Sequence, residues 1–204
     1  MAVTQAGKVF IVDDDPLVRS TLEHALGQAG IVSLKFASAE QLLLYIDGAS
    51  VGCVVTDLRM PGMSGIELQE ELVRRCCPLP VIVMTGFADV PLAVRAIKAG
   101  ALDILQKPFK NEELFRQVRG ALIIAEERAS RTSERAAVKR QYDSLSVRES
   151  EVFCEIVLGH SNKEIAKKLG LSPRTVESHR ARVMEKMQVE SVAALIKKAA
   201  AIAE

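Results

Sequence analysis

Five short apolar runs recur in the first half of the chain, and a helical pattern follows each of them. The runs span 9–12, 31–36, 51–56, 81–84 and 102–105, and the helical patterns begin near Pro16, Ala39, Gly65, Asp89 and Asn111. Strands that alternate with helices in this way predict a parallel sheet. Because connections between parallel strands are right-handed, helices are expected on both faces of that sheet. The predicted fold class of this part is therefore α/β, built from (βα)5.

Asp57 lies at the end of the third run, where the sequence turns into LRMPGMSG at 58–65. In open α/β sheets the carboxyl ends of the strands border the crevice that holds ligands. Pro61, Gly62 and Gly65 favour a turn directly after the aspartate, which leaves its carboxylate exposed in that crevice. Asp57 is thus a candidate nucleophile. The alternative is that an aspartate before a Pro-Gly turn only forms the turn.

Polar residues also follow three other runs. Asp13 and Asp14 come after 9–12, Thr85 after 81–84 and Lys107 after 103–106. In a parallel sheet these side chains share one edge with Asp57, and three clustered carboxylates need a cation such as Mg²⁺. Together with a hydroxyl and an ammonium group, the set predicts a site that accepts a phosphoryl group. The alternative for Asp13 and Asp14 is that they only cap a helix.

Residues 5 to about 125 resemble a response-regulator receiver domain. The resemblance rests on IVDDD, VVTDLRMPGMSGIEL, VIVMTG and the KPF at 107–109. It implies a flavodoxin-like fold, phosphorylation of Asp57, a switch hydroxyl at Thr85, a phosphoryl partner at Lys107, and Mg²⁺ as the cofactor of Asp13, Asp14 and Asp57. One position departs from the family, because the aromatic residue usually found three residues before the lysine is Ile104 here. We therefore expect Thr85 to act mainly through its backbone and the following helix.

Apolar periodicity lapses after Ile124. The segment EERASRTSERAAVKRQ at 126–141 carries alternating charges and small residues, which suit a solvated helix as well as a flexible strap. We therefore place a receiver domain at 1–125, a linker at 126–142, and an all-α domain at 143–204.

From Asp143 onward the sequence predicts only helices. SVRE at 146–149 and SNKE at 161–164 fit the capping-box pattern, and Ser172 with Pro173 marks another helix start. Gly159 and Gly170 supply the stops. The expected helices span about 147–158, 162–169, 173–187 and 190–202, and the second and third have the outline of a helix-turn-helix.

The helix-turn-helix segment is basic. Residues 161–187 contain seven Lys or Arg and three Asp or Glu, whereas residues 1–125 contain 12 basic and 14 acidic side chains. This difference favours an anionic partner for the second domain. On the third helix Val176, Val183 and Met187 repeat at helical spacing and are expected to pack inward. The opposite face, suited to the major groove, comprises Arg174, Glu177, Ser178, Ala181, Arg182 and Glu185. The alternative is a hairpin whose charged face is only solvated.

The segment SNKEIAKKLGLSPRTVESHRARVMEKM at 161–187 resembles the helix-turn-helix of LuxR-type and NarL-type regulators. With LSVRESEVF before it, the whole arrangement resembles a FixJ-like transcriptional activator. By this likeness, Glu177, Ser178 and Ala181 lie where bases are read, and the candidates for backbone contacts are Lys163, Arg174, Arg180 and Lys186. His179 is either a satisfied, half-buried histidine or a phosphate contact, and we favour the former.

Composition adds two expectations. The four cysteines show no metal-binding spacing and are expected to be reduced thiols. No stretch approaches the roughly 18 consecutive apolar residues of a membrane span, and the N-terminus lacks a signal pattern. We therefore expect a cytoplasmic protein with no membrane partner.

The sequence as a whole predicts a two-component response regulator and not an enzyme, since a receiver catalyses only its own phosphoryl transfer and slow dephosphorylation. A sensor histidine kinase is expected to phosphorylate Asp57. The chain then binds promoter DNA as a homodimer and activates transcription with RNA polymerase as a partner. One alternative is a phosphohydrolase of the haloacid-dehalogenase type, but IVDDDPL lacks the D-x-D-x-T pattern. Another is a phosphorylation-independent interaction module, against which the acidic pair and Lys107 argue.

Overall fold

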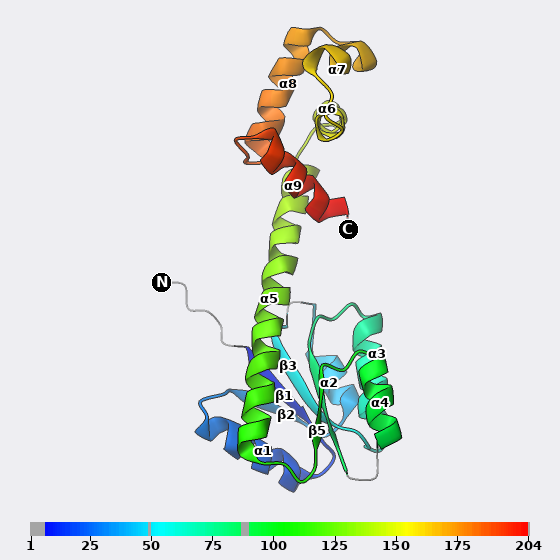
Figure 1. Cartoon of the computed structure of the whole chain (residues 1–204), viewed down its shortest axis with the longest axis vertical. Helices are drawn as coiled ribbons and strands as arrows, with labels where there is room; N and C mark the ends of the chain where they lie inside the picture. The colour runs from blue at the N-terminus through cyan, green and yellow to red at the C-terminus, as the bar shows by residue number, and fades with distance from the viewer. Residues whose placement is uncertain (1–6, 49, 87–89, 204) are drawn as a thin grey trace. The chain divides into compact units, whose positions relative to one another are not determined.

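The computed structural model of the chain describes residues 7–48, 50–86 and 90–203. They divide into two compact units between Ser130 and Arg131. Figure 1 shows that the first unit combines a sheet with helices and that the second is helical throughout. The predicted fold class, an α/β domain followed by an all-α domain, is confirmed.

The first unit contains one parallel sheet with the strand order β2-β1-β3-β4-β5. Its strands are β1 (Lys8–Val12), β2 (Ser33–Phe36), β3 (Gly52–Asp57), β4 (Val81–Thr85) and β5 (Asp103–Gln106). The central strands are almost continuously apolar because both of their faces are covered. The strand order changes direction between β1 and β3, so the carboxyl ends of these two strands border the crevice where such sheets bind ligands.

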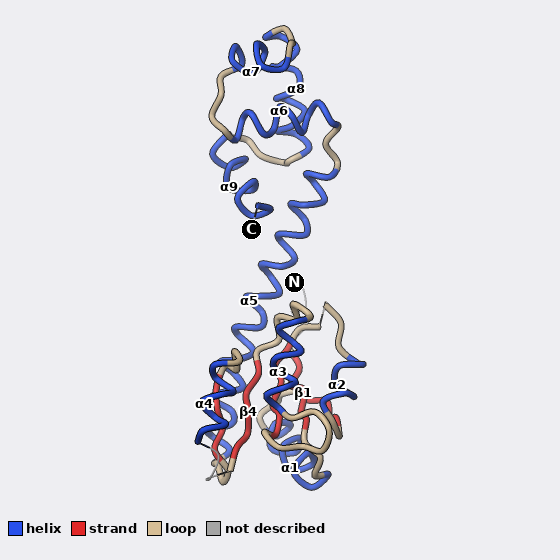
Figure 2. Tube along the Cα trace, turned by 90° about the vertical axis from the view of Figure 1, so that its right-hand side faces the viewer, coloured by secondary structure: helices blue, strands red, loops and turns tan. Residues whose placement is uncertain are grey.

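Helices cover both faces of this sheet, as Figure 2 shows. One face packs against α1 (Pro16–Gln28) and the first part of α5 (Asn111–Asp143), the other against α2 (Ala39–Tyr45), α3 (Gly65–Arg74) and α4 (Val90–Lys98). Because side chains alternate along a strand, Val9 and Ile11 enter the first core while Phe10 and Val12 enter the second. Asp89, near which a helix was expected to begin, lies outside the described residues.

Helix α5 is one continuous helix of 33 residues, so the segment 126–142 is helical. The sequence allows either a solvated helix or a flexible strap for this segment, and the segment is a helix. Most side chains from 126 to 137 are exposed, whereas Val138 is 4 % exposed and packs into the core of the second unit. The carboxyl end of α5 therefore belongs to the helical unit.

The helical unit continues with α6 (Val147–Val157), α7 (Asn162–Leu169), α8 (Pro173–Lys186) and α9 (Val192–Ala203). The two predicted capping boxes are present at Ser146 and Ser161, and the Ser172 side chain accepts from the Thr175 amide. Gly170 ends α7 in the left-handed conformation, with φ +67°. The inward positions are confirmed, since Val176, Val183 and Met187 are fully buried.

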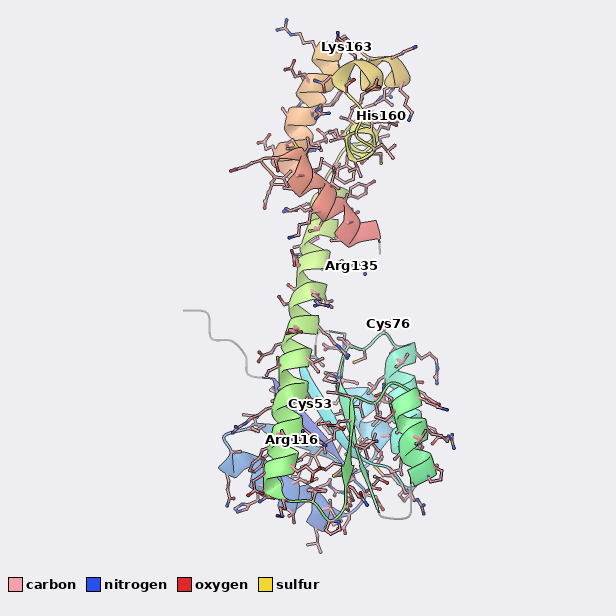
Figure 3. All side chains as sticks on the ribbon, in the orientation of Figure 1. Cys53, Cys76, Arg116, Arg135, His160 and Lys163 are labelled. Carbon is pink, nitrogen blue, oxygen red and sulfur yellow. The ribbon has the colours of Figure 1, made fainter. Side chains whose placement is uncertain are left out.

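Two observations concern the cysteines and the possibility of a membrane span. Cys53 is buried in β3 and Cys76 is exposed after α3 (Figure 3), and all four cysteines are free thiols. Burial raises the pKa of the Cys53 thiol to about 12, which keeps it protonated. Across residues 7–48, 50–86 and 90–203, no helix combines the length and the apolar character that crossing a membrane requires.

Candidate functional site

Three of the polar side chains predicted to share one sheet edge are in direct contact. Asp57 is the last residue of β3, Asp13 follows β1 and Lys107 follows β5. The Lys107 ammonium lies 2.5 Å from Asp57 Oδ1 and 3.3 Å from Asp13 Oδ2, and it donates to both carboxylates. One cation thus joins two acids that lie 44 positions apart in the sequence and come from adjacent strands.

Backbone amides hold the remaining carboxylate oxygens. Asp57 Oδ2 accepts from the Arg59 amide at 2.7 Å, and Asp13 Oδ1 accepts from the Asp15 amide at 2.9 Å. The Arg19 guanidinium donates to the backbone carbonyl of Asp13 at 2.6 Å. Each acid is therefore oriented by the turn that follows its own strand, and Arg59 and Arg19 are contributors that the sequence analysis missed.

A side chain from α2 fixes the turn after Asp57. Glu40 Oε1 accepts from the Met63 amide at 3.1 Å. Gly62 adopts a left-handed conformation with φ +77°, which favours glycine. At Gly65 a Cβ would stand 2.3 Å from the Asp57 carbonyl oxygen, so only glycine allows α3 to begin this close to the end of β3. The glycines are visible in the sequence, but no local pattern points to Glu40.

Burial separates the roles of the two acids. Asp13 is 2 % exposed, whereas the Asp57 side chain is 17 % exposed beside Lys107. Burial raises the pKa of Asp13, and hydrogen bonds from the Asp15 amide and Lys107 offset only part of this effect. Burial also opposes the charge on Lys107, but Asp57 and Asp13 together raise the pKa of the lysine above its usual value. Asp57 is thus the accessible acid, next to a lysine that stays charged.

Thr85 and Asp14 do not join this cluster. Thr85 ends β4 one residue beyond Met84, which pairs with Asp57, and its hydroxyl donates to the Gly86 carbonyl at 3.3 Å. Asp14 is exposed. Within the described part of the chain, no hydrogen bond or ion pair connects either residue to Asp57, Asp13 or Lys107. Both residues lie at the predicted edge of the sheet, outside the hydrogen-bonded cluster of the described residues.

The donor chemistry at this edge fits Mg²⁺. No group of three or more His, Cys, Asp or Glu among the described residues is gathered closely enough to hold a metal ion. Mg²⁺ does not need such a cage, because it is commonly bound through one or two carboxylates and keeps several waters. Asp13 and Asp57 supply carboxylate oxygens here, with the exposed Asp14 next in sequence. The predicted ligand set therefore stays a prediction that is compatible with the residues present.

A hollow of about 410 Å³ opens beside Thr85. Ile104, the residue in place of an aromatic ring, lines it together with the apolar side chains of Ala93, Val94 and Ile97 from α4. Val94 and Ile97 are 50 % and 48 % exposed. Thr85, the predicted switch residue, is thus next to an open apolar surface.

In the helical unit, the predicted DNA-reading residues of α8 lie in a row on its solvent side. The exposed ones are Arg174, Glu177, Ser178, Ala181 and Arg182. Ser178 Oγ donates to the Arg174 carbonyl at 3.2 Å, so the serine is turned toward its own helix here. Arg180 is half-buried, and Lys163 is exposed on α7 (Figure 3). The face is accessible, and its contacts with DNA remain predictions.

Lys186 has a partner inside the protein. Its ammonium lies 2.6 Å from Glu149 Oε2 and donates to the Ser144 carbonyl at 3.0 Å. Glu149 is also the capping-box residue of α6, and the hydrogen bond from Lys186 with that from the Ser146 amide lowers its pKa to about 2. His179 is half-buried, as we favour, but its Nδ1 has no hydrogen-bond partner among the described residues.

Comparison with known proteins matches both units to families. Residues 9–119 match the family described as response regulator receiver domain, and residues 143–199 match bacterial regulatory proteins of the luxR family. The transcriptional regulatory protein FixJ of Bradyrhizobium diazoefficiens is 41 % identical over 195 residues, which cover 96 % of this chain and 95 % of the relative. The response regulator protein TodT of Pseudomonas putida is 37 % identical over 193 residues, covering 95 % and 85 % of the two chains.

Solved structures give the same result. The response regulator StyR aligns with a TM-score of 0.84 at 38 % identity, over 95 % of this chain and 98 % of that one. Full-length FixJ from B. japonicum aligns with a TM-score of 0.60 at 40 % identity, over 98 % of both chains. These matches cover the site at the sheet edge and the helix-turn-helix together. The chain therefore belongs to the FixJ-like two-component response regulators, which join a receiver domain to a luxR-family DNA-binding domain.

Proposed function

We propose that a sensor histidine kinase phosphorylates this regulator on Asp57. The observation that carries the proposal is the contact of Lys107 with an accessible Asp57 carboxylate at the carboxyl end of β3. In the transfer, a carboxylate oxygen of Asp57 forms a bond to phosphorus. The bond from phosphorus to the histidine nitrogen of the kinase breaks, and its electron pair stays with the imidazole.

The chain's own residues then hold the product. Lys107 exchanges part of its contact with Asp57 and Asp13 for a phosphoryl oxygen, which keeps its charge paired. Asp13, Asp14 and Asp57 are the residues that would hold Mg²⁺, which would supply further positive charge for the phosphoryl oxygens. The Thr85 hydroxyl, which now donates to the Gly86 carbonyl, is the nearby neutral donor that can turn toward the new anion.

The substitution Asp57→Asn tests the assignment. It keeps the shape of the side chain but removes the nucleophilic charge, so labelling by acetyl phosphate in the presence of Mg²⁺ is expected to disappear. Asp15→Asn is the matched control, because Asp15 is an exposed neighbour of the acidic pair and asparagine also caps helices well. Acid-labile, hydroxylamine-sensitive label that persists in Asp57→Asn would contradict the proposal.

We propose further that phosphorylation promotes a homodimer, which binds promoter DNA and activates transcription through contact with RNA polymerase in the cytoplasm. Support for the dimer comes from the apolar surface of α4, where Val94 and Ile97 are half exposed next to the hollow at Thr85. Support for DNA binding comes from the row of exposed polar and basic side chains on α8. In this proposal the chain acts as a regulator, and the phosphoryl transfer takes place at Asp57.

A charge placed on this surface tests the dimer. Val94→Asp is expected to keep the phosphorylated chain monomeric in light scattering, because a carboxylate is costly to bury in an apolar interface. Val73→Asp is the control, since Val73 is a comparably exposed valine on α3, at 58 %. Both variants should accept label on Asp57. Equal dimerisation of the two variants would place the interface elsewhere.

A further inference from the structure

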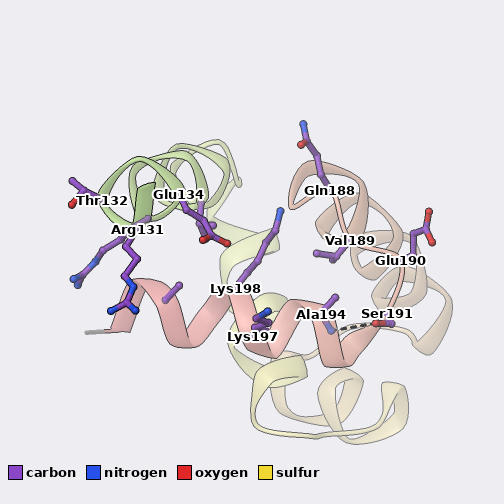
Figure 4. Close-up of a pocket in the computed structure, with 13 residues that line it drawn as sticks. Arg131, Thr132, Glu134, Gln188, Val189, Glu190, Ser191, Ala194, Lys197 and Lys198 are labelled. Carbon is purple, nitrogen blue, oxygen red and sulfur yellow. Dashed lines mark hydrogen bonds between the residues drawn. The ribbon is translucent and has the colours of Figure 1, made fainter. Parts of the chain in front are cut away.

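A groove of about 840 Å³ runs between the end of α5 and α9 inside the helical unit. Figure 4 shows that side chains from α5 line one side, and side chains from α9 and the segment before it line the other. Its apolar lining includes Val138, Val189 and Ala194. Its edges carry the cations of Arg131, Arg135 and Lys197. The groove therefore combines an apolar floor with a basic rim.

These three cations are unpaired within the described part of the helical unit. Among the described residues, Arg131, Arg135 and Lys197 form neither an ion pair nor a side-chain hydrogen bond. Arg131 and Arg135 stand one turn apart on α5, and like charges at this spacing destabilise a helix slightly. Lys198 differs from them, because it donates to Gln141 Oε1 at 2.8 Å and to the Met187 carbonyl at 2.7 Å. The three free cations are thus available to an external anion.

The chemistry of the groove favours an acidic protein segment over nucleic acid. A phosphate backbone offers no apolar group to the floor, and Glu134 and Glu190 on the same rim would repel a uniform polyanion. An amphipathic helix satisfies both parts of the groove, with apolar side chains one turn apart on the floor and carboxylates against the rim. The predicted DNA-reading face belongs to a different element, α8, whose exposed residues do not line this groove.

We propose that the groove between α5 and α9 docks an acidic, amphipathic helical segment of a partner protein. Apolar side chains of the segment pack on Val138, Val189 and Ala194, while its carboxylates pair with Arg131, Arg135 and Lys197. This inference goes beyond the proposed function, because the groove lies within the helical unit and uses neither Asp57 nor the exposed residues of α8.

The probe is a fluorescein-labelled synthetic helix that carries Leu at every third or fourth position and Glu on its flanks, measured by fluorescence anisotropy with the full chain. The charge-reversed variant with Arg135→Glu and Lys197→Glu is expected to weaken binding by about tenfold or more, and the wild-type affinity should fall with added salt. Ala194→Trp keeps every charge but fills the floor, and it should also abolish binding. The control variant carries Arg116→Glu and Arg119→Glu, two exposed cations on the part of α5 in the first unit.

Several outcomes overturn the proposal. Unchanged peptide binding in both groove variants contradicts it, as does an equal loss in the control variant. If the charge-reversed variant also loses affinity for unrelated DNA and its salt slope falls by about two units, the groove is a DNA contact. If light scattering shows that it loses self-association instead, the groove is an interface between copies of this chain. Retained labelling of Asp57 in every variant separates these failures from a failure of the proposed function.

Discussion

The two units build their functional surfaces in opposite ways. In the α/β unit, Asp13, Asp57 and Lys107 lie at the ends of three strands, and the Lys107 ammonium contacts both carboxylates. In the helical unit, Arg174, Glu177 and Arg182 lie along a single helix, exposed, and no side-chain hydrogen bond links them to one another within the described structure. The side chains of the first surface already contact one another, whereas those of the second are exposed to solvent.

This difference predicts how mutations act. Residues of the converging site are buried or held by backbone amides, so changing them alters folding and chemistry together. Residues on the α8 face are exposed, so changing them should alter DNA binding alone. Lys186 is the exception in the helical unit, because it is tied to Glu149. Three experiments test this contrast.

The same glycine substitution should have unequal costs in the two units. In Gly65→Ala the new Cβ would lie 2.3 Å from the Asp57 carbonyl oxygen, and the overpacking is expected to cost about 3 kcal/mol of unfolding free energy. At Gly170 no heavy atom beyond the adjacent residues lies within 4 Å of a Cβ, so Gly170→Ala meets only the left-handed backbone penalty of about 1 kcal/mol. Urea unfolding measures both values. Equal costs would mean that α3 moves away freely and that the turn after Asp57 is not rigid.

On the predicted DNA-reading face, some residues should determine the base preference and others should only contribute affinity. If Glu177 accepts from a cytosine amino group, Glu177→Ala should relax the preference at one base pair, at a cost of about 2 kcal/mol. Arg174→Ala should instead weaken all sequences alike and reduce the salt slope by about one unit. Binding titrations against single-base operator variants decide between them. If Glu177→Ala weakens every operator equally, the specificity comes from Ser178, Arg182 or DNA shape.

Lys186 should behave as a structural residue. Lys186→Met removes the charged partner of Glu149, whose side chain is only 5 % exposed, and is expected to lower the unfolding free energy at pH 7 by about 1–2 kcal/mol. A lysine that contacts only phosphate would leave stability unchanged and weaken DNA binding. An unfolding free energy within error of the wild type would instead indicate that Lys186 is a DNA-contact residue.

The pH dependence of this pair follows from the lowered pKa of Glu149. A carboxyl whose folded pKa is about 2, below its ordinary value of 4.5, adds stability above pH 4.5 that is lost as the pH falls toward 2. In Lys186→Met the pKa of Glu149 moves back toward the ordinary value, so this contribution shrinks. The stability difference between wild type and variant should therefore be full at pH 7 and smaller at pH 3.

Much of the α/β site could be predicted from the sequence because a parallel sheet brings strand ends together. The runs 9–12, 51–56 and 103–106 locate Asp13, Asp57 and Lys107 without knowledge of any side-chain contact. The unequal burial of Asp13 and Asp14 could not be predicted, since it depends on how the turn after β1 lies against Lys107 and Arg19. Glu40 was missed because its partner, the Met63 amide, is 23 residues away.

In the helical unit, caps and inward positions could be predicted because they depend on neighbours within a few residues. Ser146 and Glu149 form a local pair, and Val176 and Val183 repeat at helical spacing. The ion pair of Lys186 with Glu149 joins residues 37 positions apart, and no local sequence pattern around either residue predicts it. The likeness to luxR-type regulators therefore makes Lys186 a candidate for DNA backbone contacts without revealing its internal partner.

The long α5 also decides where the chain can be divided into fragments. The luxR-family match begins at residue 143, yet the helical core includes Val138, and the Tyr142 ring lies 5.1 Å from that of Phe153. A fragment that starts at Asp143 would leave a hole in that core and remove one wall of the groove beside α9. A fragment that starts at Arg131 keeps both, so recombining this DNA-binding domain with another receiver requires the last turns of α5 as part of the exchanged piece.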